Sequence, residues 1–432
     1  MKYKWRGKLL TSQQLGKTHI ARPLHYLVSY RCSLLHHYYY LTRGRPTGRS
    51  RLKRMRIGID ARFYGPAGRG LGRYLSELIA ELERQDQTNE YVVFLRHANW
   101  NDYRPQNPRF SKALADIPWY GWREQIFLPP LLRRRRLDLV HFPHFNVPLL
   151  YRRPFVVTIH DLILLKYPTP RASFLGPIIF WLKYKVYRLV IASALRRART
   201  VITVSQTTKQ DLEQTFPFAK QKNIIVTHEA SAGNFSAPDS PPATRHSSLA
   251  TPYFLYVGSA YPHKNLETLL AAFVRFRANH PEYRLVIVGA HDRFMTRLMN
   301  EARAHGRDRQ VEFRGAVSDS ELARLYDEAI AYVFPSLCEG FGLPPLEAMS
   351  RGLPVAAARA SCLPEILGDA AVYFDPQNPV AIAAALSELA ENPDKRSVLA
   401  TAGRAQAGRY NWSDCARKTL AAYRSSIPSS LS

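Results

Sequence analysis

The sequence has 432 residues, and its 61 Lys and Arg against 34 Asp and Glu give a formal net charge of +27. This length suffices for two or three domains, and a hydrophobic content of 46% excludes wholesale disorder. The 4 cysteines form no CxxC pair and show no zinc-like spacing with histidine. They argue against a disulfide scaffold or a structural metal cluster and favour a reducing compartment.

The positive charge is unevenly distributed along the chain. Residues 1–54 hold 13 basic residues and no acidic one, which leaves +14 for the remainder. The apolar run Leu24–Leu41 is interrupted by Arg31 and by histidines, and it is too short for a membrane span. One interpretation is a basic extension, disordered or bound to anionic lipid or nucleic acid. The alternative is that translation begins at Met55, because Met55–Asp60 is typical of the first strand of a domain.

From Arg56 onward, short apolar runs alternate with segments of helical spacing. The alternation predicts a parallel sheet covered by helices on both faces, in a first domain over residues 55–235. The first strand, Arg56–Asp60, is followed by a loop rich in glycine and then by a helix over Tyr74–Leu82. The glycines of this loop are Gly65, Gly68, Gly70 and Gly72. Further strands are expected at Tyr91–Leu95, Leu137–Phe142, Phe155–Ile159, Val201–Val204 and Ile224–Val226.

A stretch rich in Ser, Ala and Pro predicts a linker over residues 236–252, after which the alternation restarts. A second domain is expected over residues 253–410, followed by a C-terminal helix and tail over residues 411–432. Its helices include Asn265–Asn279 and Ser320–Ala329. Its strands are expected at Tyr253–Val257, Tyr283–Val288, Val311–Phe313, Ile330–Phe334, Val355–Ala358 and Val372–Phe374. The predicted fold is α/β, with two Rossmann-like domains facing across a cleft that receives the ligand.

One motif in the second half carries the clearest chemistry. Glu339 follows a predicted strand, and Glu347 lies near the start of the next helix, whose Pro344 and Pro345 suit a first turn. Free backbone amides in the loop Gly340–Leu343 can hold sugar hydroxyls or phosphate oxygens. The alternative is a helix-capping loop whose glutamate complements the helix dipole. The motif alone does not decide between the two.

The spacing of Glu339 and Glu347 resembles the Glu-x7-Glu motif of retaining glycosyltransferases with the two-Rossmann GT-B architecture, particularly glycosyltransferase family 4. The resemblance extends over essentially all of Met55–Tyr410. The other segments that carry it, in order and in spacing, are Arg56–Tyr74, Val140–Pro148, Val157–Asp161, Val201–Ser205, Val257–Asn265 and Ser361–Asp369.

The resemblance implies roles for the residues of the motif. Glu347 would bind the ribose hydroxyls of a nucleotide sugar, and Glu339 would contact the hexose. The loop backbone would assist in holding the donor. The residues of that backbone are Gly340, Phe341, Gly342 and Leu343.

A second donor-binding element is expected where the first strand of the second half ends, at Gly258 and Ser259. The resemblance implies that Lys264 neutralises the pyrophosphate, and a fixed cation stabilises a diphosphate as it leaves. Ser259 stands where many members of the family carry arginine, and His263 stands in place of another. We therefore expect Ser259, His263 or an arginine elsewhere in the chain to complete the pyrophosphate clamp.

In the first half, the glycine loop and one strand end face the predicted cleft. Gly68 and Gly70 let the backbone approach an acceptor or a phosphate closely. His160 and Asp161 end a strand, and the resemblance places the histidine near the donor sugar, with Asp161 on the acceptor side. The alternative is a structural histidine paired to Asp161. Weaker candidates near another strand end are His141 and His144.

We expect neither a metal ion nor another cofactor, because no convincing Asp-x-Asp motif is present. The resemblance implies that the anomeric configuration is retained. No carboxylate is confidently placed as a nucleophile, which argues against a covalent intermediate. The expected route is departure of the diphosphate with attack from the same face, the acceptor hydroxyl losing its proton to a phosphate oxygen.

A basic and apolar segment suggests a partner. Leu162–Gln210 contains no acidic residue, and within it Phe174–Thr200 is apolar in its first part and strongly basic in its second. With the four arginines of Arg133–Arg136, it predicts contact with an anionic membrane surface. The alternative is an ordinary domain helix with a solvated basic face. No nucleic-acid-binding module is recognisable, so nucleic acid is not an expected partner.

The sequence therefore predicts a cytoplasmic hexosyltransferase, peripheral on the inner face of the membrane. It would use a nucleotide sugar and a glycan or lipid-linked acceptor in cell-surface polysaccharide synthesis, such as that of O-antigen. GDP-mannose is the first donor expected, because relatives with the Ile-Asp-Ala-Arg start and the Lys-Asn loop are often mannosyltransferases. A UDP-hexose stays open. Two alternatives are a sugar-nucleotide epimerase of similar fold and a catalytically silent, membrane-bound scaffold.

Overall fold

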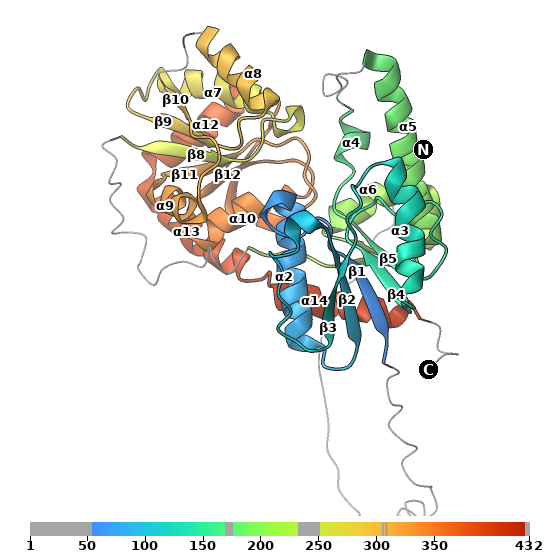
Figure 1. The fold of residues 1–432 in the computed structure, drawn as a ribbon. Helices are drawn as coiled ribbons and strands as arrows, with labels where there is room; N and C mark the ends of the chain where they lie inside the picture. The colour runs from blue at the N-terminus through green and yellow to red at the C-terminus, as the bar shows by residue number, and fades with distance from the viewer. Residues whose placement is uncertain (1–53, 169–175, 232–250, 305, 307–309, 428–432) are drawn as a thin grey trace, which may run out of the picture. The chain divides into compact units, whose positions relative to one another are not determined.

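The computed structural model describes residues 54–168, 176–231, 251–304, 306 and 310–427. They belong to one unit of the chain, Arg54–Ser432. The expectations for the basic extension and for most of the linker fall outside the described residues. Figure 1 shows the described part as two α/β regions.

The first region is built on a seven-stranded parallel sheet in the order β3-β2-β1-β4-β5-β6-β7. Its strands are β1 (Arg56–Asp60), β2 (Glu90–Leu95), β3 (Phe110–Leu114), β4 (Leu139–Phe142), β5 (Phe155–Ile159), β6 (Thr200–Thr203) and β7 (Ile224–Val226). Its helices are α2 (Arg69–Gln85), α3 (Trp122–Arg134), α4 (Ile163–Lys166), α5 (Gly176–Arg197) and α6 (Gln206–Thr215). Short 3₁₀ turns lie at Pro66–Gly68, His97–Asn99 and Pro217–Gln221.

The second region is built on a six-stranded parallel sheet in the order β10-β9-β8-β11-β12-β13. Its strands are β8 (Tyr253–Val257), β9 (Arg284–Val288), β10 (Val311–Phe313), β11 (Ala331–Phe334), β12 (Val355–Ala358) and β13 (Ala371–Phe374). Its helices are α7 (Leu266–Arg277), α8 (Arg293–Ala304), α9 (Asp319–Glu328), α10 (Leu343–Ser350), α11 (Leu363–Leu367), α12 (Pro379–Glu391) and α13 (Pro393–Ala407), after a 3₁₀ turn at Pro262–Lys264.

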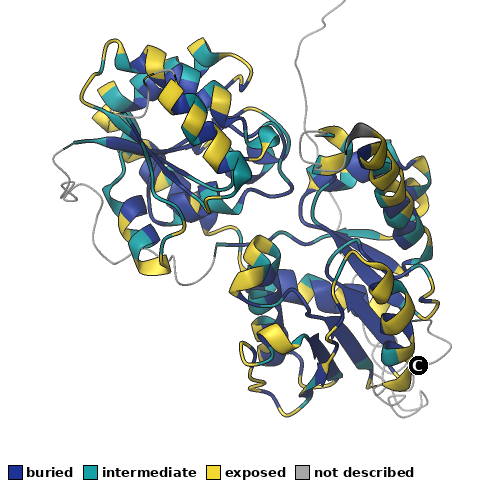
Figure 2. Cartoon of the chain, turned by 45° about the horizontal axis from the view of Figure 1, so that its top comes forward, coloured by how far each residue is buried: buried dark blue, intermediate teal, exposed yellow. Residues whose placement is uncertain are grey.

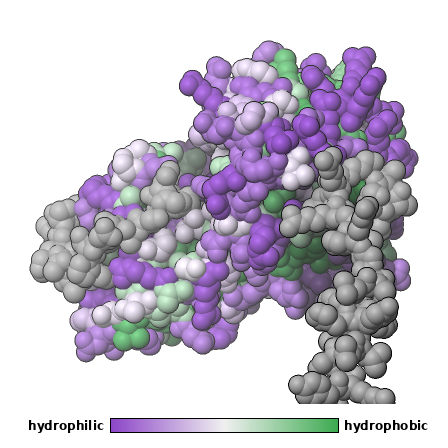
Figure 3. Space-filling view, turned by 90° about the horizontal axis from the view of Figure 1, so that it is seen from below, coloured by the Kyte–Doolittle hydropathy of each residue, from purple (hydrophilic) through white to green (hydrophobic). Residues whose placement is uncertain are grey.

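The predicted alternation of strands and helices is confirmed, with one strand missed. Figure 2 shows the central strands as buried and the outer faces of many helices as exposed. Strand β3 was not predicted, because Ser111 and Lys112 interrupt its apolar pattern at the edge of the sheet. The face of the molecule seen in Figure 3 is largely hydrophilic.

The expected glycine loop is shorter than predicted. Gly70 and Gly72 lie inside α2, and only Gly65 and Gly68 precede it. A Cβ atom on Gly72 would come within 2.0 Å of the Gly65 carbonyl oxygen. Glycine is thus needed at Gly72 for close packing of the helix against the loop rather than for loop flexibility.

The chain ends by returning to the first region. Helix α14 (Trp412–Ser425) packs against α2 and against strands β6 and β7. Trp412 lies edge-on to Tyr74, with ring centroids 6.0 Å apart, and Tyr423 bonds His141. Part of the core of the first region is therefore built from the C-terminal end of the sequence. Among the described helices, none is both long and apolar enough to cross a bilayer.

Candidate active site

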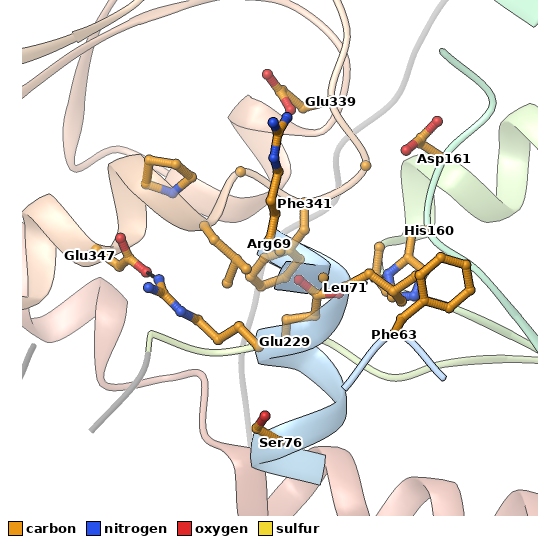
Figure 4. A pocket seen from close by; sticks show the side chains of 18 of the residues that line it. Phe63, Arg69, Leu71, Ser76, His160, Asp161, Glu229, Glu339, Phe341 and Glu347 are labelled. Carbon is orange, nitrogen blue, oxygen red and sulfur yellow. Dashed lines mark hydrogen bonds and ion pairs between the residues drawn. The ribbon is translucent and has the colours of Figure 1, made fainter. Parts of the chain in front are cut away.

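A cavity of about 980 Å³ is lined by residues of both regions. It lies at the carboxyl ends of strands, with β5 and β11 each leading into it, which is where parallel α/β sheets bind ligands. Its volume is typical of a small-molecule site. The predicted site residues that line it are Gly68, Gly70, His160, Asp161, Glu339, Gly340, Phe341, Gly342, Leu343 and Glu347 (Figure 4).

The remaining predicted residues lie beside this cavity rather than among its described lining residues. Gly258 and Ser259 follow Val257, which does line it. Lys264 reaches the site through Glu339, because its Nζ lies 2.6 Å from Glu339 Oε1. Both side chains are largely buried, so this ion pair is shielded from solvent.

The surroundings of Lys264 bear on the missing part of the pyrophosphate clamp. Burial, with a smaller effect of the neighbouring Lys264 charge, lowers the pKa of His263 to about 4. His263 is therefore neutral near pH 7 and adds no cation. An arginine does line the cavity: in Figure 4 the side chain of Arg69 runs from the start of α2 toward Glu339. Sequence reasoning did not single out this residue.

The loop between β11 and α10 is held by specific backbone conformations. Gly342 adopts a φ of +92° and is the N-cap residue of α10, a conformation that glycine adopts without strain. Ser361 anchors the middle of the loop, since its hydroxyl accepts from the Glu339 amide and donates to the Glu339 carbonyl oxygen over 2.8 Å. The loop therefore presents Glu339 to the cavity from a fixed backbone.

Glu347 lies in α10, the helix that follows this loop, and is only 2% exposed. Its carboxylate forms an ion pair with Arg73, which comes from α2 in the other region. Tyr326 donates a second hydrogen bond over 3.4 Å. Burial raises the pKa of Glu347 to about 7, against the opposing effects of Arg73 and Tyr326. Neither partner was foreseen from the sequence.

Gly340 joins the two regions at the cavity. A Cβ atom at this position would lie 2.1 Å from the backbone carbonyl oxygen of His160. The Ser205 hydroxyl donates to the Gly340 carbonyl oxygen over 2.7 Å, and the Thr208 hydroxyl lies within 3.3 Å of both carbonyls. The loop that carries Glu339 is thus seated directly on the end of β5.

His160 is clamped by two acceptors. Its Nδ1 lies 3.0 Å from Glu229 Oε1, and its Nε2 lies 2.9 Å from the Pro143 carbonyl oxygen. With Glu229 ionised, both contacts are satisfied when both ring nitrogens donate, so the contacts favour the imidazolium form. Burial lowers its pKa, but the bonds to Glu229 and to the Pro143 carbonyl outweigh that effect and raise it.

His160 does not pair with Asp161, which was the alternative left open by the sequence. Asp161 Oδ1 accepts from the Ile163 amide over 2.9 Å, and burial raises the pKa of its carboxyl group. The partner is Glu229, which also lines the cavity and was not predicted. One signal was available: Glu229 follows β7, so it ends a strand at the same sheet edge as His160.

The two weaker histidine candidates differ in position. His141 is buried in the first region between Tyr423 and Thr158, at 2.8 Å from each hydroxyl oxygen, and is a core residue. His144 does line the cavity. Burial lowers the pKa of each to about 3, so both are neutral. Among the described residues, no group of His, Cys, Asp and Glu has the arrangement of a metal site.

Comparison with known protein families agrees with this arrangement. A sequence model described as glycosyl transferases group 1 matches residues 245–406, and one described as glycosyltransferase family 4 matches residues 68–228. The chain is 28% identical over 379 residues to O-antigen chain mannosyltransferase B of Escherichia coli, covering 82% of this chain and 96% of that protein.

Solved structures confirm the predicted GT-B fold. Sucrose-phosphate synthase from Thermosynechococcus elongatus superposes with a TM-score of 0.69 at 22% identity, covering 86% of this chain and 98% of that one. HepE from Anabaena, solved in complex with UDP and glucose, gives a TM-score of 0.63 at 18% identity and covers 85% and 99%.

Proposed function

Because this chain belongs to the family 4 (group 1) glycosyltransferases, we propose that it transfers a hexose from a nucleotide sugar to a hydroxyl of a glycan, with retention of configuration. The donor that we propose first is GDP-mannose, so that the transferred hexose is mannose. The observation that carries this proposal is the pair Glu339 and Glu347. Glu339 lies in the loop between β11 and α10 and Glu347 lies in α10 itself; both line one cavity, and Lys264 is bound to Glu339.

The choice of donor rests on two relatives. The Escherichia coli relative is named as a mannosyltransferase, which supports mannose. The Anabaena structure holds UDP and glucose, which supports a nucleotide sugar as the class of donor and keeps a UDP-hexose as the competing donor. The name of the Escherichia coli relative, an O-antigen chain mannosyltransferase, supports a growing surface glycan as acceptor.

The site residues take the following roles in the proposed reaction. The ribose hydroxyls bond to Glu347, which requires Arg73 to move aside or to share the carboxylate. Lys264 and Arg69 stabilise the negative charge that accumulates on the diphosphate as the bond from the anomeric carbon to its oxygen breaks. The acceptor oxygen bonds to the anomeric carbon on the same face, and its proton passes to a phosphate oxygen of the leaving diphosphate. His160, whose pKa is raised by Glu229, would place a protonated ring beside the sugar. No metal ion or other cofactor enters this scheme.

Radiolabelled nucleotide sugars, offered one at a time to the protein with membrane extract, test the proposal. We expect label from GDP-mannose in a glycan product. Removing a charge-stabilising group typically lowers kcat about 10²–10³-fold, so Lys264→Ala should do so, and Glu347→Ala should raise the donor KM. The matched controls Lys220→Ala and Glu282→Ala alter exposed residues that are not among the described lining of the cavity.

Three outcomes would contradict the proposal. Epimerised sugar nucleotide formed without acceptor would identify an epimerase. Absence of transfer from every donor by folded protein would favour a silent scaffold. Transfer that is unaffected in both site variants would show that the reaction takes place elsewhere.

A further inference from the structure

Helix α5 buries one face and leaves an apolar stripe on the other. Phe180 and Ile191 are buried, and Tyr187 packs edge-on against Phe145 with centroids 4.6 Å apart. On the opposite side of the helix four large apolar side chains are 50–83% exposed. They follow one another at helical spacing and are Ile178, Leu182, Val186 and Leu189.

The charged residues of α5 are all positive. Lys183, Lys185 and Arg188 are exposed on the same helix, and α5 contains no acidic residue. An apolar stripe flanked by Lys and Arg suits the boundary between lipid headgroups and acyl chains. A single exposed leucine would need no explanation, but a continuous row on one helix does.

Helix α3 presents the same combination. Trp122 is 67% exposed and lies beside Phe127, with ring centroids 6.3 Å apart, and Ile126 is also exposed. The acidic residue of this helix, Glu124, is turned inward to a buried ion pair with Arg62. The basic residues of the helix are Arg123, Arg133 and Arg134.

The two helices are linked through the loop between β4 and β5. Arg133 of α3 donates to the Leu150 carbonyl oxygen, and Arg197 of α5 donates to that of Pro148, each over 3.3 Å. Phe145 bridges their other ends, since it stacks on Tyr120, just before α3, and packs against Tyr187 of α5. Figure 1 shows α3 and α5 in the same region of the molecule.

We propose that this surface, the α3–α5 face, lies on an anionic lipid bilayer, with its apolar side chains in the interface and its Lys and Arg on lipid phosphates. Positive charge on both helices favours lipid over a second copy of the chain, which would bring like charges together. Tyr120 and His144 line the cavity and contact Phe145. The face therefore borders the site, and on the proposed function it would bring a lipid-linked acceptor to the cavity.

Co-sedimentation of the full chain with vesicles tests the face. One set of vesicles contains equal parts phosphatidylglycerol and phosphatidylethanolamine, and the other is phosphatidylcholine alone. We expect binding to the anionic set to exceed binding to the neutral set by at least about tenfold at low salt. The apolar variant combines Ile178→Ser, Leu182→Ser and Leu189→Ser, and the charge variant combines Lys183→Gln, Lys185→Gln and Arg188→Gln. Each should lose at least about tenfold in partitioning.

Matched controls separate this face from general basicity. Val380 and Val398 are equally exposed apolar residues of the second region, and their serine variants should bind as the wild type does. Three exposed arginines outside the face serve for charge, as Arg275→Gln, Arg409→Gln and Arg424→Gln. Thermal unfolding of every variant should match the wild type, because the substituted side chains are exposed.

Two results would overturn the proposal. If the face variants bind vesicles as well as the controls do, other residues of the chain hold the lipid. If the wild type is a dimer by light scattering without lipid and the apolar variant is a monomer, the face is a protein interface. Vesicle binding is measured without donor or acceptor. Failure of the proposed transfer reaction would therefore leave this result standing, and the reverse also holds.

Discussion

Glu229 and His160 form a buried pair at the cavity wall, with Oε1 and Nδ1 3.0 Å apart. Glu229 follows β7 and His160 follows β5, so two strand ends of one sheet bring them together. The pair fixes both the orientation of the ring and its charge. The other groups facing His160 are Tyr74, whose ring lies edge-on at 4.7 Å, Asp161, and the neutral His141 and His144.

Removing the negative charge of Glu229 should move the pH profile of the enzyme. The imidazolium persists below its pKa, which Glu229 raises, so wild-type activity should decline only as pH rises through that raised value. In Glu229→Gln, burial still lowers the pKa of His160, but the negative charge that opposes this effect is removed. The alkaline limb of kcat/KM should then shift toward acid. The control Glu213→Gln should keep the wild-type profile, and an unshifted limb in Glu229→Gln would refute the role of the charge.

Nucleotide binding should depend on pH through Glu347. Its carboxyl pKa is raised to about 7, so the ionised form that accepts ribose hydroxyls is lost as pH falls below that value. Isothermal titration with a nucleoside diphosphate should show Kd weakening up to about tenfold per pH unit below pH 7. In Glu347→Gln this pH dependence should be reduced to that of the nucleotide phosphate itself. Parallel pH profiles for the two proteins would count against ribose binding at this residue.

A methyl group at Gly340 should separate the loop from the strand end beneath it. The added Cβ of Gly340→Ala would meet the His160 carbonyl oxygen at 2.1 Å, so the loop bearing Glu339 must shift. Displacements of about 1 Å near a reacting centre can cost about 100-fold in rate, and we expect a loss of that order in kcat/KM with a lowered Tm. Gly121→Ala is the matched control, because its Cβ meets nothing within 4 Å. A wild-type rate in Gly340→Ala would show that this contact does not position the site.

Gly70 allows stability and ligand approach to be separated. It lies in the first turns of α2, and a Cβ there meets nothing within 4 Å. Gly70→Ala should stabilise the helix by about 0.5–1 kcal/mol, measured by urea unfolding. If the donor approaches this backbone closely, the donor KM should nevertheless rise several-fold. Increased stability with an unchanged KM would remove Gly70 from the donor site.

The sequence was most informative where local pattern and strand order decide the structure. His160, Asp161 and Glu339 each follow an apolar run, and parallel strands deliver such residues to one sheet edge. The start of α2 could not be predicted in this way, because glycines such as Gly70 and Gly72 are typical of loops. Their place in the helix depends on packing against Gly65.

Partners distant in the chain could not be predicted. Arg73 and Glu347 are 274 positions apart and meet only because the two regions approach each other in the fold. Glu229 stands in no recognisable motif, and its pairing with His160 depends on the spacing of β5, β6 and β7. Side-chain ion pairs across a cavity carry no periodic signal, so a single sequence does not reveal them.

The position of helix α14 in the sequence determines when the core of the first region can be completed. Trp412 and Tyr423 fill part of the core beneath α2, and Ser426 bonds Thr200 of β6 over 2.9 Å. During synthesis the first sheet therefore emerges long before the helix that covers it. The apolar side chains of that sheet are fully covered only after α14 has been synthesised. The N-terminal region therefore lacks part of its core until α14 has been synthesised, in contrast to domains that complete their core as they emerge. A premature stop codon before Trp412 would leave the second sheet complete but would remove part of the core that packs on the first sheet.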